Sequence, residues 1–241
     1  MRVGLFDSGI GGLTVLKELI NQYPNNEYIY YADTINLPYG EKTREELIEI
    51  GKNIIEFLDM KKVDVIVIAC GTCSSLVDDY RELTPTPIFD VITPTVEYVG
   101  NNFNDIGLIA TKSTIENMVF ESKLLKKGLN VERTACPSFV PFIENMSDTL
   151  DLTELDSLKF KHLEAVILGC THYPLIKDKI EEYLGIPTNE MGKCESVLMD
   201  LPDTGNKSID IFVSKYNGSL DRKIIEILGT TPIIHEVKKV I

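Results

Sequence analysis

The chain has 241 residues, a formal net charge of −13 and 44% hydrophobic residues, a composition typical of a globular protein with a full core. The negative charge argues against a nucleic-acid partner, because binding phosphates needs a basic face. No apolar run approaches the roughly eighteen residues that span a bilayer, and no basic and apolar leader precedes the first predicted strand. We therefore expect a cytoplasmic protein with no membrane partner.

The first part of the chain alternates β-branched runs with amphipathic segments, which predicts parallel strands covered by helices. Strands are predicted at residues 3–6, 28–32 and 63–69. Helices are predicted at residues 13–23 and 44–59, and residues 74–83 can form another. The run at 63–69 is almost continuously apolar, as expected for a central parallel strand buried on both faces.

A second series of the same kind begins near Ile92. Its predicted strands are residues 105–110, 131–135 and 164–168, with a helix at 114–127. Residues 148–161 are polar and irregular, which predicts a surface connection. The predictions for the rest of the chain are a helix or turn leading into a strand at 204–214, a helix at 220–228 and a closing strand at 233–240.

Two pairs of segments resemble each other at an offset of about one hundred residues. V-G-L-F-D-S at residues 3–8 resembles I-G-L-I-A-T at 106–111, and V-I-V-I-A-C-G-T at 65–72 resembles A-V-I-L-G-C-T-H at 165–172. Two pairs at nearly one spacing favour a duplication over a chance likeness of βα units. The duplication predicts two similar α/β domains with a cleft between them, lined by the strand ends where ligands of open α/β sheets bind.

Five cysteines in a chain expected to be intracellular are not predicted to form structural disulfides. Cys70 and Cys170 each follow a predicted central strand, where a nearby helix N-terminus would favour the thiolate. One such cysteine would be interpreted as a small buried hydrophobe, but two at equivalent strand ends favour a reactive pair. Cys73, Cys136 and Cys194 have no counterpart in the other half and are predicted to be structural.

Asp7 and Ser8 end the first predicted strand, and the glycine-rich run at 9–12 lets backbone N–H groups approach a ligand. An aspartate in this place is also a common helix N-cap. The last glycine of the dinucleotide motif G-x-G-x-x-G is missing, since Thr14 stands there. Nucleotide binding is therefore poorly supported.

Three further features can belong to a site or to ordinary structure. His172 lies two residues after Cys170, which makes it a candidate acid or base for that thiol, although a single histidine is more often structural. The run D-T-I-N-L-P-Y-G at residues 33–40 has the composition of a tight loop. Glu144 follows an apolar run and could equally cap a helix or face solvent.

Four motifs resemble those of the glutamate racemases in the aspartate/glutamate racemase superfamily. They are D-S-G-I-G-G-L-T-V from residue 7, D-T-I-N-L-P-Y-G from residue 33, A-C-G-T-C-S-S from residue 69 and L-G-C-T-H-Y-P-L from residue 168. The resemblance extends along the whole chain. It implies two pseudo-symmetric parallel-sheet domains, residues 1–91 plus 204–241 and residues 92–203, with the active site between them.

The resemblance also implies an isomerase that interconverts L- and D-glutamate without a cofactor or a metal, as a homodimer that supplies D-glutamate for peptidoglycan. Cys70 and Cys170 match the two catalytic thiols, Asp7 matches the carboxylate that assists the first, and His172 and Glu144 match the groups that assist the second. The residues expected to hold a small acidic amino acid are Asp7, Ser8, Pro38, Tyr39, Gly40, Gly71, Thr72, Thr111, Thr114, Thr171 and His172.

The chemistry suits these residues independently of the family. Inverting a stereocentre by proton transfer needs one base on each face of the α-carbon, and a duplicated fold supplies a thiol on each side. One position departs from the family, because Gly71 stands where an asparagine is usual. The missing side chain predicts free space beside Cys70, and leaves aspartate or another acidic amino acid as an alternative substrate.

Other classes of function stay open from the residues alone. Cys70 and Cys73 form a C-G-T-C motif of the kind found in thiol–disulfide oxidoreductases. If the strand ends converge, Cys70, Cys73, Cys170 and His172 could instead form a tetrahedral zinc site. A relative that keeps only a binding cleft is a third alternative, but the presence of both thiols argues against it.

Overall fold

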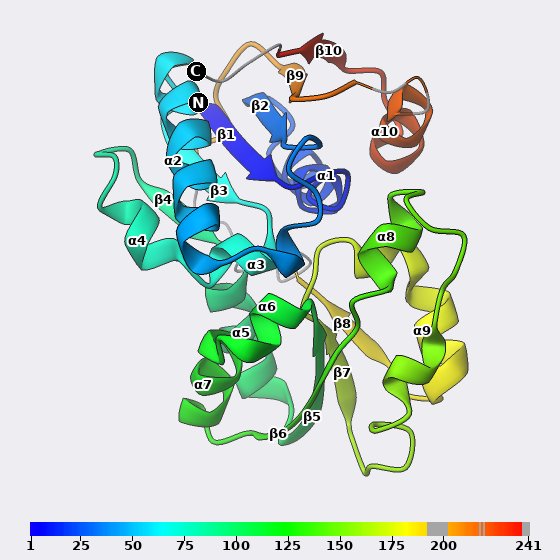
Figure 1. The fold of residues 1–241 in the computed structure, drawn as a ribbon. Coiled ribbons are helices and arrows are strands. Elements are labelled where there is room, and N and C mark those ends of the chain that lie inside the picture. The colour runs from blue at the N-terminus through cyan, green and yellow to red at the C-terminus, as the bar shows by residue number, and fades with distance from the viewer. Residues whose placement is uncertain (192–201, 217, 219, 238–241) are drawn as a thin grey trace.

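The computed structural model describes residues 1–191, 202–216, 218 and 220–237. Within these residues the strands form a six-stranded sheet in the order β10-β9-β2-β1-β3-β4 and a four-stranded sheet in the order β6-β5-β7-β8. All pairs of neighbouring strands are parallel. Figure 1 shows the first sheet with its helices above the second, which confirms the predicted α/β fold of two parallel sheets.

Most of the predicted elements are confirmed, with ends that differ by a few residues. The strands are β1 (Arg2–Asp7), β2 (Glu27–Ala32), β3 (Val65–Ile68), β4 (Ile88–Asp90), β5 (Asp105–Ala110), β6 (Asn130–Ala135), β7 (Ala165–Leu168), β8 (Thr188–Glu190), β9 (Ser208–Val213) and β10 (Ile233–Glu236). The longer helices are α1 (Leu13–Gln22), α2 (Arg44–Met60), α5 (Ile92–Asn102), α9 (Lys177–Leu184) and α10 (Leu220–Leu228). The short strands β4 and β8 and the helices α5 and α9 were not predicted, and the end of the predicted closing strand lies outside the described residues.

The two sheets share one strand order. β2-β1-β3-β4 in the first corresponds to β6-β5-β7-β8 in the second, so the two pairs of similar segments occupy equivalent places. The two central strands β3 and β7 are buried along their whole length, as their apolar runs predict. β9 and β10 extend the first sheet beyond β2, and α10 packs on α1. The C-terminal segment therefore adds to the first half of the molecule.

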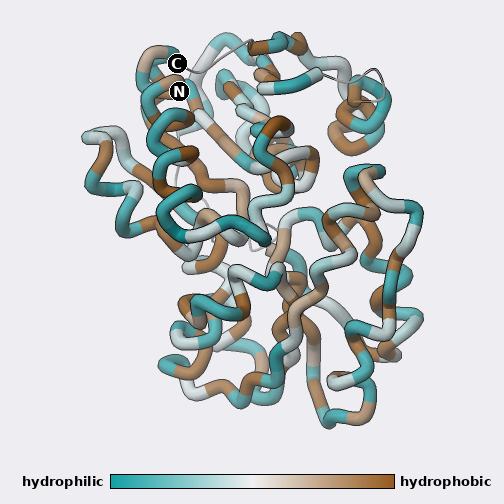
Figure 2. The backbone as a smooth tube through the Cα atoms, in the orientation of Figure 1, coloured by the Kyte–Doolittle hydropathy of each residue, from teal (hydrophilic) through white to brown (hydrophobic). Residues whose placement is uncertain are grey.

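The helices cover the sheets with their apolar faces. Along α2, Figure 2 shows hydrophobic and hydrophilic residues side by side, and the buried set includes Leu47, Ile54 and Leu58. Thr43 caps this helix in a capping box with Glu46. Within the described residues, no helix is long and apolar enough to cross a membrane.

Two predicted helices are interrupted, and both interruptions lie near the site described below. Residues 74–83 contribute to α3 (Gly71–Ser74) and α4 (Val77–Arg81), so helical structure begins directly after Cys70. Residues 114–127 contribute to α6 (Lys112–Glu116) and α7 (Val119–Lys126), because Met118 takes a left-handed backbone conformation with φ of 57°. Periodicity alone does not show such breaks.

The polar connection at residues 148–161 is only partly a surface segment. Residues Leu152–Leu155 form the 3₁₀ turn η2, and both Leu155 and Leu158 are buried in the core of the second half. The prediction of a surface connection was therefore wrong for these two leucines, whose apolar side chains are isolated among polar neighbours in the sequence.

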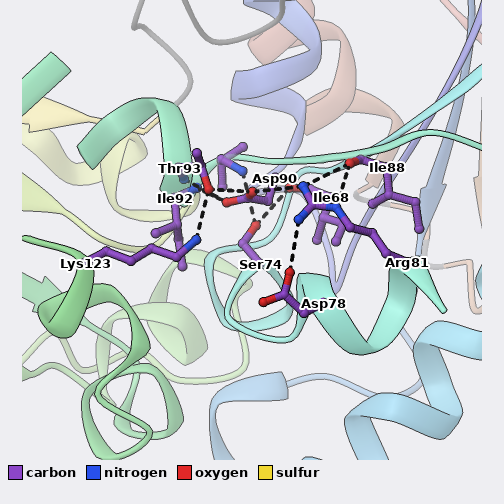
Figure 3. A network of polar contacts seen from close by, with 10 residues as sticks. Ile68, Ser74, Asp78, Arg81, Ile88, Asp90, Ile92, Thr93 and Lys123 are labelled. Atoms are coloured by element: carbon purple, nitrogen blue, oxygen red, sulfur yellow. Dashed lines mark hydrogen bonds and ion pairs between the residues drawn. The ribbon is translucent and has the colours of Figure 1, made fainter. Parts of the chain in front are cut away.

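The chain crosses from the first sheet to the second at Asp90, the last residue of β4. Its buried carboxylate accepts hydrogen bonds from the backbone N–H groups of Ile92 at 2.9 Å and Thr93 at 2.8 Å, and from the Thr93 hydroxyl at 2.8 Å. The Arg81 guanidinium lies 4.0 Å away, and Lys123 of α7 donates to the Thr93 hydroxyl (Figure 3). This network fixes the start of α5 against both halves.

We expect Asp90→Ala to lower the free energy of unfolding by about 2 kcal/mol, because it removes a helix-terminal acceptor and leaves buried N–H groups unpaired. Urea denaturation measures the loss. The matched control is Asp78→Ala, which removes an exposed carboxylate that pairs with the same Arg81 and should cost less than about 0.5 kcal/mol. Equal losses in the two variants would contradict the role given to Asp90.

Candidate active site

The polar residues predicted for the site meet where the strand ends of the two sheets face each other. Close contacts join the halves: the Ile10 N–H donates a hydrogen bond to Glu144 Oε1 at 2.8 Å, and the Gly11 N lies 3.3 Å from His172 Nε2. The Thr171 hydroxyl lies 3.5 Å from Asp7 Oδ2. Thr171, Asp7 and His172 are buried, so the contacts lie in a region from which water is excluded.

Cys70 ends the first central strand segment and is the N-cap residue of α3. Its thiol is free and only 4% exposed. Burial raises the pKa of the Cys70 thiol well above its ordinary value, and a hydrogen bond with Cys73 and the nearby Asp7 carboxylate raise it further. The expectation that the helix N-terminus favours the Cys70 thiolate was therefore wrong, since α3 is only four residues long and burial dominates.

The Asp7 carboxylate lies beside Cys70 and is fully buried. Its Oδ2 accepts a hydrogen bond from the Gly12 N–H at 2.5 Å, whereas Oδ1 has no hydrogen-bond partner. Burial raises the pKa of Asp7, while the positive charge of His172 and a hydrogen bond with Cys70 act in the opposite direction. Asp7 thus anchors the turn before α1 and also presents a free oxygen beside the first thiol.

Cys170 is the equivalent thiol of the second half, free and 6% exposed, and it begins a chain of three side chains. Its Sγ lies 3.8 Å from His172 Nδ1, and His172 Nε2 lies 2.7 Å from Glu144 Oε1. Burial alone would lower the pKa of His172, but the hydrogen bonds with Cys170 and Glu144 raise it well above its ordinary value. The histidine is therefore a cation between a thiol and a carboxylate.

Glu144 keeps its charge in the same way. Burial raises the pKa of Glu144, but the hydrogen bond and positive charge of His172, the Ile10 N–H and the Lys223 ammonium together lower it below its ordinary value. Sequence spacing alone left the role of Glu144 open. The structure places it against His172 because α8 (Phe139–Ile143) ends directly before it.

The glycine-rich run after β1 has a further use that the sequence did not show. A Cβ atom on Gly9 would lie 2.0 Å from Glu144 Oε1, and one on Gly11 would lie 2.2 Å from His172 Nδ1. Only glycine lets the backbone approach the carboxylate and the imidazole of the other half so closely. The backbone N–H groups of this run therefore donate to protein side chains, where the sequence predicted a ligand.

Three buried threonines form a cluster of hydroxyl groups across the two halves. Thr72 Oγ1 of α3 lies 3.0 Å from Thr111 Oγ1, which lies 3.0 Å from Thr114 Oγ1. Thr111 also caps α6 through the Thr114 N–H. These hydroxyls hydrogen-bond to one another, and each can turn to donate to an anion.

The predicted loop at residues 33–40 lies against this threonine cluster. A Cβ atom on Gly40 would lie 2.7 Å from Thr111 Cβ, and Pro38 and Gly40 both line a small cavity next to Thr111. The Tyr39 hydroxyl donates to buried Asp33 Oδ2 at 2.7 Å. Asp33 has no sequence signal of its own beyond the composition of the loop, which it shapes without being exposed.

Of the remaining predicted residues, Ser8 is buried beside Asp7. Cys136 is also buried, and Cys194 lies outside the described residues. In the part of the chain that the structure describes, no group of three or more histidine, cysteine, aspartate or glutamate side chains is arranged to hold a metal ion. The geometry gives no support to the alternative zinc site.

The space predicted beside Cys70 is filled. A Cβ atom on Gly71 would lie 2.6 Å from the carbonyl oxygen of Gly169 and 2.8 Å from Met191 Cε. The prediction of free space was therefore wrong, because the backbone after β7 and the Met191 side chain approach this position. Gly71 allows the ends of β3 and β7, and thus the residues bearing the two thiols, to come together.

Two thiols at equivalent strand ends, each with a different ionisable partner, define an α/β enzyme whose site is shared by the two halves. Residues 12–192 match the family model described as Asp/Glu/Hydantoin racemase. The chain belongs to this family, and it is an isomerase of the racemase class.

Individual relatives agree with this assignment. The glutamate racemase of Aquifex aeolicus is 33% identical over 95% of this chain and 94% of that protein. The glutamate racemase of Fusobacterium nucleatum is 41% identical over 77% of this chain and 74% of that protein. The crystal structure of the Francisella tularensis glutamate racemase in complex with D-glutamate matches with a TM-score of 0.86 at 30% identity, and covers 99% of this chain and 97% of that chain.

We expect Gly71→Ala to lower kcat/KM by about tenfold or more, because the added Cβ would meet a backbone carbonyl and push the two strand ends apart. Steady-state kinetics with a racemase substrate measures the loss. Gly100→Ala is the matched control, since its Cβ would meet only the flexible Lys127 side chain, at 3.1 Å. Full activity in Gly71→Ala would show that the close approach is unimportant.

We expect Glu144→Gln to destabilise the protein by about 3 kcal/mol, and most strongly between about pH 4.5 and 6.5. Because the pKa of Glu144 is lowered in the folded protein, its charge contributes stability above pH 4.5. This stability is lost as the pH falls through the pKa of Glu144 in the folded state. Because the pKa of His172 is raised in the folded protein, its charge contributes stability that is fully present below pH 6.5. This stability is lost as the pH rises through the pKa of His172 in the folded state. Chemical denaturation across this range measures the difference, with exposed Glu182→Gln as control. A pH-independent loss would contradict the ion pair.

Proposed function

We propose that the protein interconverts L- and D-glutamate by proton transfer between Cys70 and Cys170. The observation that carries this proposal is the pair of thiols at equivalent strand ends of two facing sheets. The α-carbon of a substrate held between them can lose its proton to one thiolate, and the planar carbanion that forms can take a proton from the other thiol on the opposite face. The direction of reaction decides which cysteine begins as the base.

The partners of the two thiols suit this exchange. Near Cys170, the His172 imidazolium can stabilise a thiolate and can return a proton to it, while Glu144 holds the ring in place. Near Cys70, Asp7 can accept the thiol proton because burial raises the pKa of its carboxyl group. A pair made of one thiolate and one thiol is thus available in either direction.

The remaining predicted residues suit an acidic amino acid. The hydroxyls of Thr72, Thr111 and Thr114 can donate to a carboxylate. The free Oδ1 of Asp7 is an acceptor for an ammonium group. Such local donors are needed because the net charge of −13 repels an anion on average.

Glutamate is favoured over aspartate because the relatives that cover most of this chain are named glutamate racemases. We further propose a cytoplasmic homodimer that needs no cofactor and supplies D-glutamate for peptidoglycan. Its two domains would be residues 1–91 plus 204–241 and residues 92–203, which is supported by the pairing of β9 with β2. A thiol–disulfide oxidoreductase remains the alternative of another class, and Cys73 distinguishes it.

Incubation with L- or D-glutamate in deuterium oxide, without added cofactor, should give deuterium at the α-carbon and loss of optical rotation. Cys70→Ala and Cys170→Ala should each lower racemisation by at least about a thousandfold, because one base is then missing. Cys73→Ser should keep racemisation within about threefold, since Cys73 contacts Cys70 but is not predicted as a base. Absence of exchange with glutamate, combined with exchange of aspartate, would move the proposal to the other substrate.

A further inference from the structure

Lys223 belongs to α10 in the C-terminal segment, yet its ammonium group contacts the second half of the molecule. Nζ donates a hydrogen bond to the backbone carbonyl of Ile143 at 2.7 Å. Ile143 is the last residue of α8, and Glu144 is its C-cap residue. A lysine at a helix C-terminus is stabilised by the unpaired carbonyl groups of the last turn. The contact therefore fixes the backbone from which Glu144 projects.

Lys223 also acts on Glu144 through its charge. The groups that face the Glu144 carboxylate are His172 from the second half, the Ile10 N–H from the first half, and Lys223 from the C-terminal helix. Lys223 itself faces the carboxylates of Glu144 and Glu226, and burial lowers its pKa. The ammonium group is thus one of two positive charges next to this buried carboxylate.

The position of Lys223 separates it from the groups that would meet a substrate. It lines a cleft of about 900 Å³ between α1, α8, α9 and α10, and neither Cys70 nor Cys170 lines this cleft. Other residues of this cleft include Ile10, Thr14 and Ile143. Any effect of Lys223 on proton transfer must therefore pass through Glu144 and His172.

We propose that Lys223 is a positioning residue for racemisation, which holds Glu144 against His172 and so supports Cys170 as a base. The proposal rests on the proposed function of the two thiols. The C-terminal segment, whose strands β9 and β10 belong to the first sheet, thus takes part through α10 in the chemistry of the second half. The hydrogen bond from Lys223 to Ile143 joins the two halves, so Lys223 supports Glu144 across their boundary.

The test compares Lys223→Met with Lys223→Arg, and uses Arg222→Met as a control because Arg222 is the exposed neighbour on the same helix. We expect Lys223→Met to lower kcat about fivefold with little change in KM, and to move the acidic limb of the kcat profile to higher pH, since Glu144 then takes up a proton more readily. Lys223→Arg should restore kcat to within about twofold, and Arg222→Met should match the unchanged protein.

A measurement that does not depend on enzyme activity tests the role of Lys223 separately from the proposed function. The carboxyl titration of Glu144, followed by carbon NMR, should move to higher pH in Lys223→Met but not in Arg222→Met. An unmoved titration and an unmoved kcat profile would overturn the role of Lys223, even if thermal stability fell. A shifted titration in a protein that racemises no acidic amino acid would support the contact and contradict the proposed function instead.

Discussion

The site depends on one constraint: the backbone after β1 must lie directly against an imidazole and a carboxylate that belong to the other half of the molecule. At Gly9 and Gly11 there is no room for a Cβ atom, the Ile10 N–H donates to Glu144, and the Gly11 N lies 3.3 Å from His172 Nε2. Buried ionised groups are costly unless they are paired and hydrogen-bonded. Because the cation and the carboxylate pair with each other, and the Ile10 N–H donates a further hydrogen bond to the carboxylate, both groups can remain charged away from water.

This constraint makes the two thiols unequal although the strands that carry them are equivalent. The same strand order recurs in both sheets, so duplication explains why each thiol follows a central strand. It does not explain their partners. Cys70 lies beside Asp7 and Cys73, which raise the pKa of its thiol together with burial, whereas Cys170 contacts a histidine whose pKa is raised. The proposed two-base reaction needs one thiolate and one thiol, and these surroundings would let an almost symmetric fold treat its two thiols differently.

The sequence predicted the central strands well because their apolar runs are continuous and their ends carry the cysteines. It could not show where residues 114–127 break, since the left-handed Met118 carries no sequence signal comparable to glycine. Nor could it show the environment of Gly71, because the carbonyl of Gly169 that fills this space is distant in sequence. The motifs identified the site residues through resemblance to a family. The contacts among them, and the direction of the Cys70 pKa, required the packing of both halves.

Closure of the site and binding of an acidic amino acid use the same chemical groups. Cys70 and Cys170 are almost completely buried, so groups that cover them must move before a substrate reaches them. If the halves separate, the contacts that break include hydrogen bonds of neutral donors, such as the Ile10 N–H and the hydroxyls of Thr72 and Thr111. Water can replace these bonds, so opening costs little net hydrogen bonding. When the halves close again around a substrate, its carboxylate can take the place of a threonine hydroxyl as the acceptor. Closure is then more favourable around an anion than around a neutral molecule, although the overall charge of the protein repels anions.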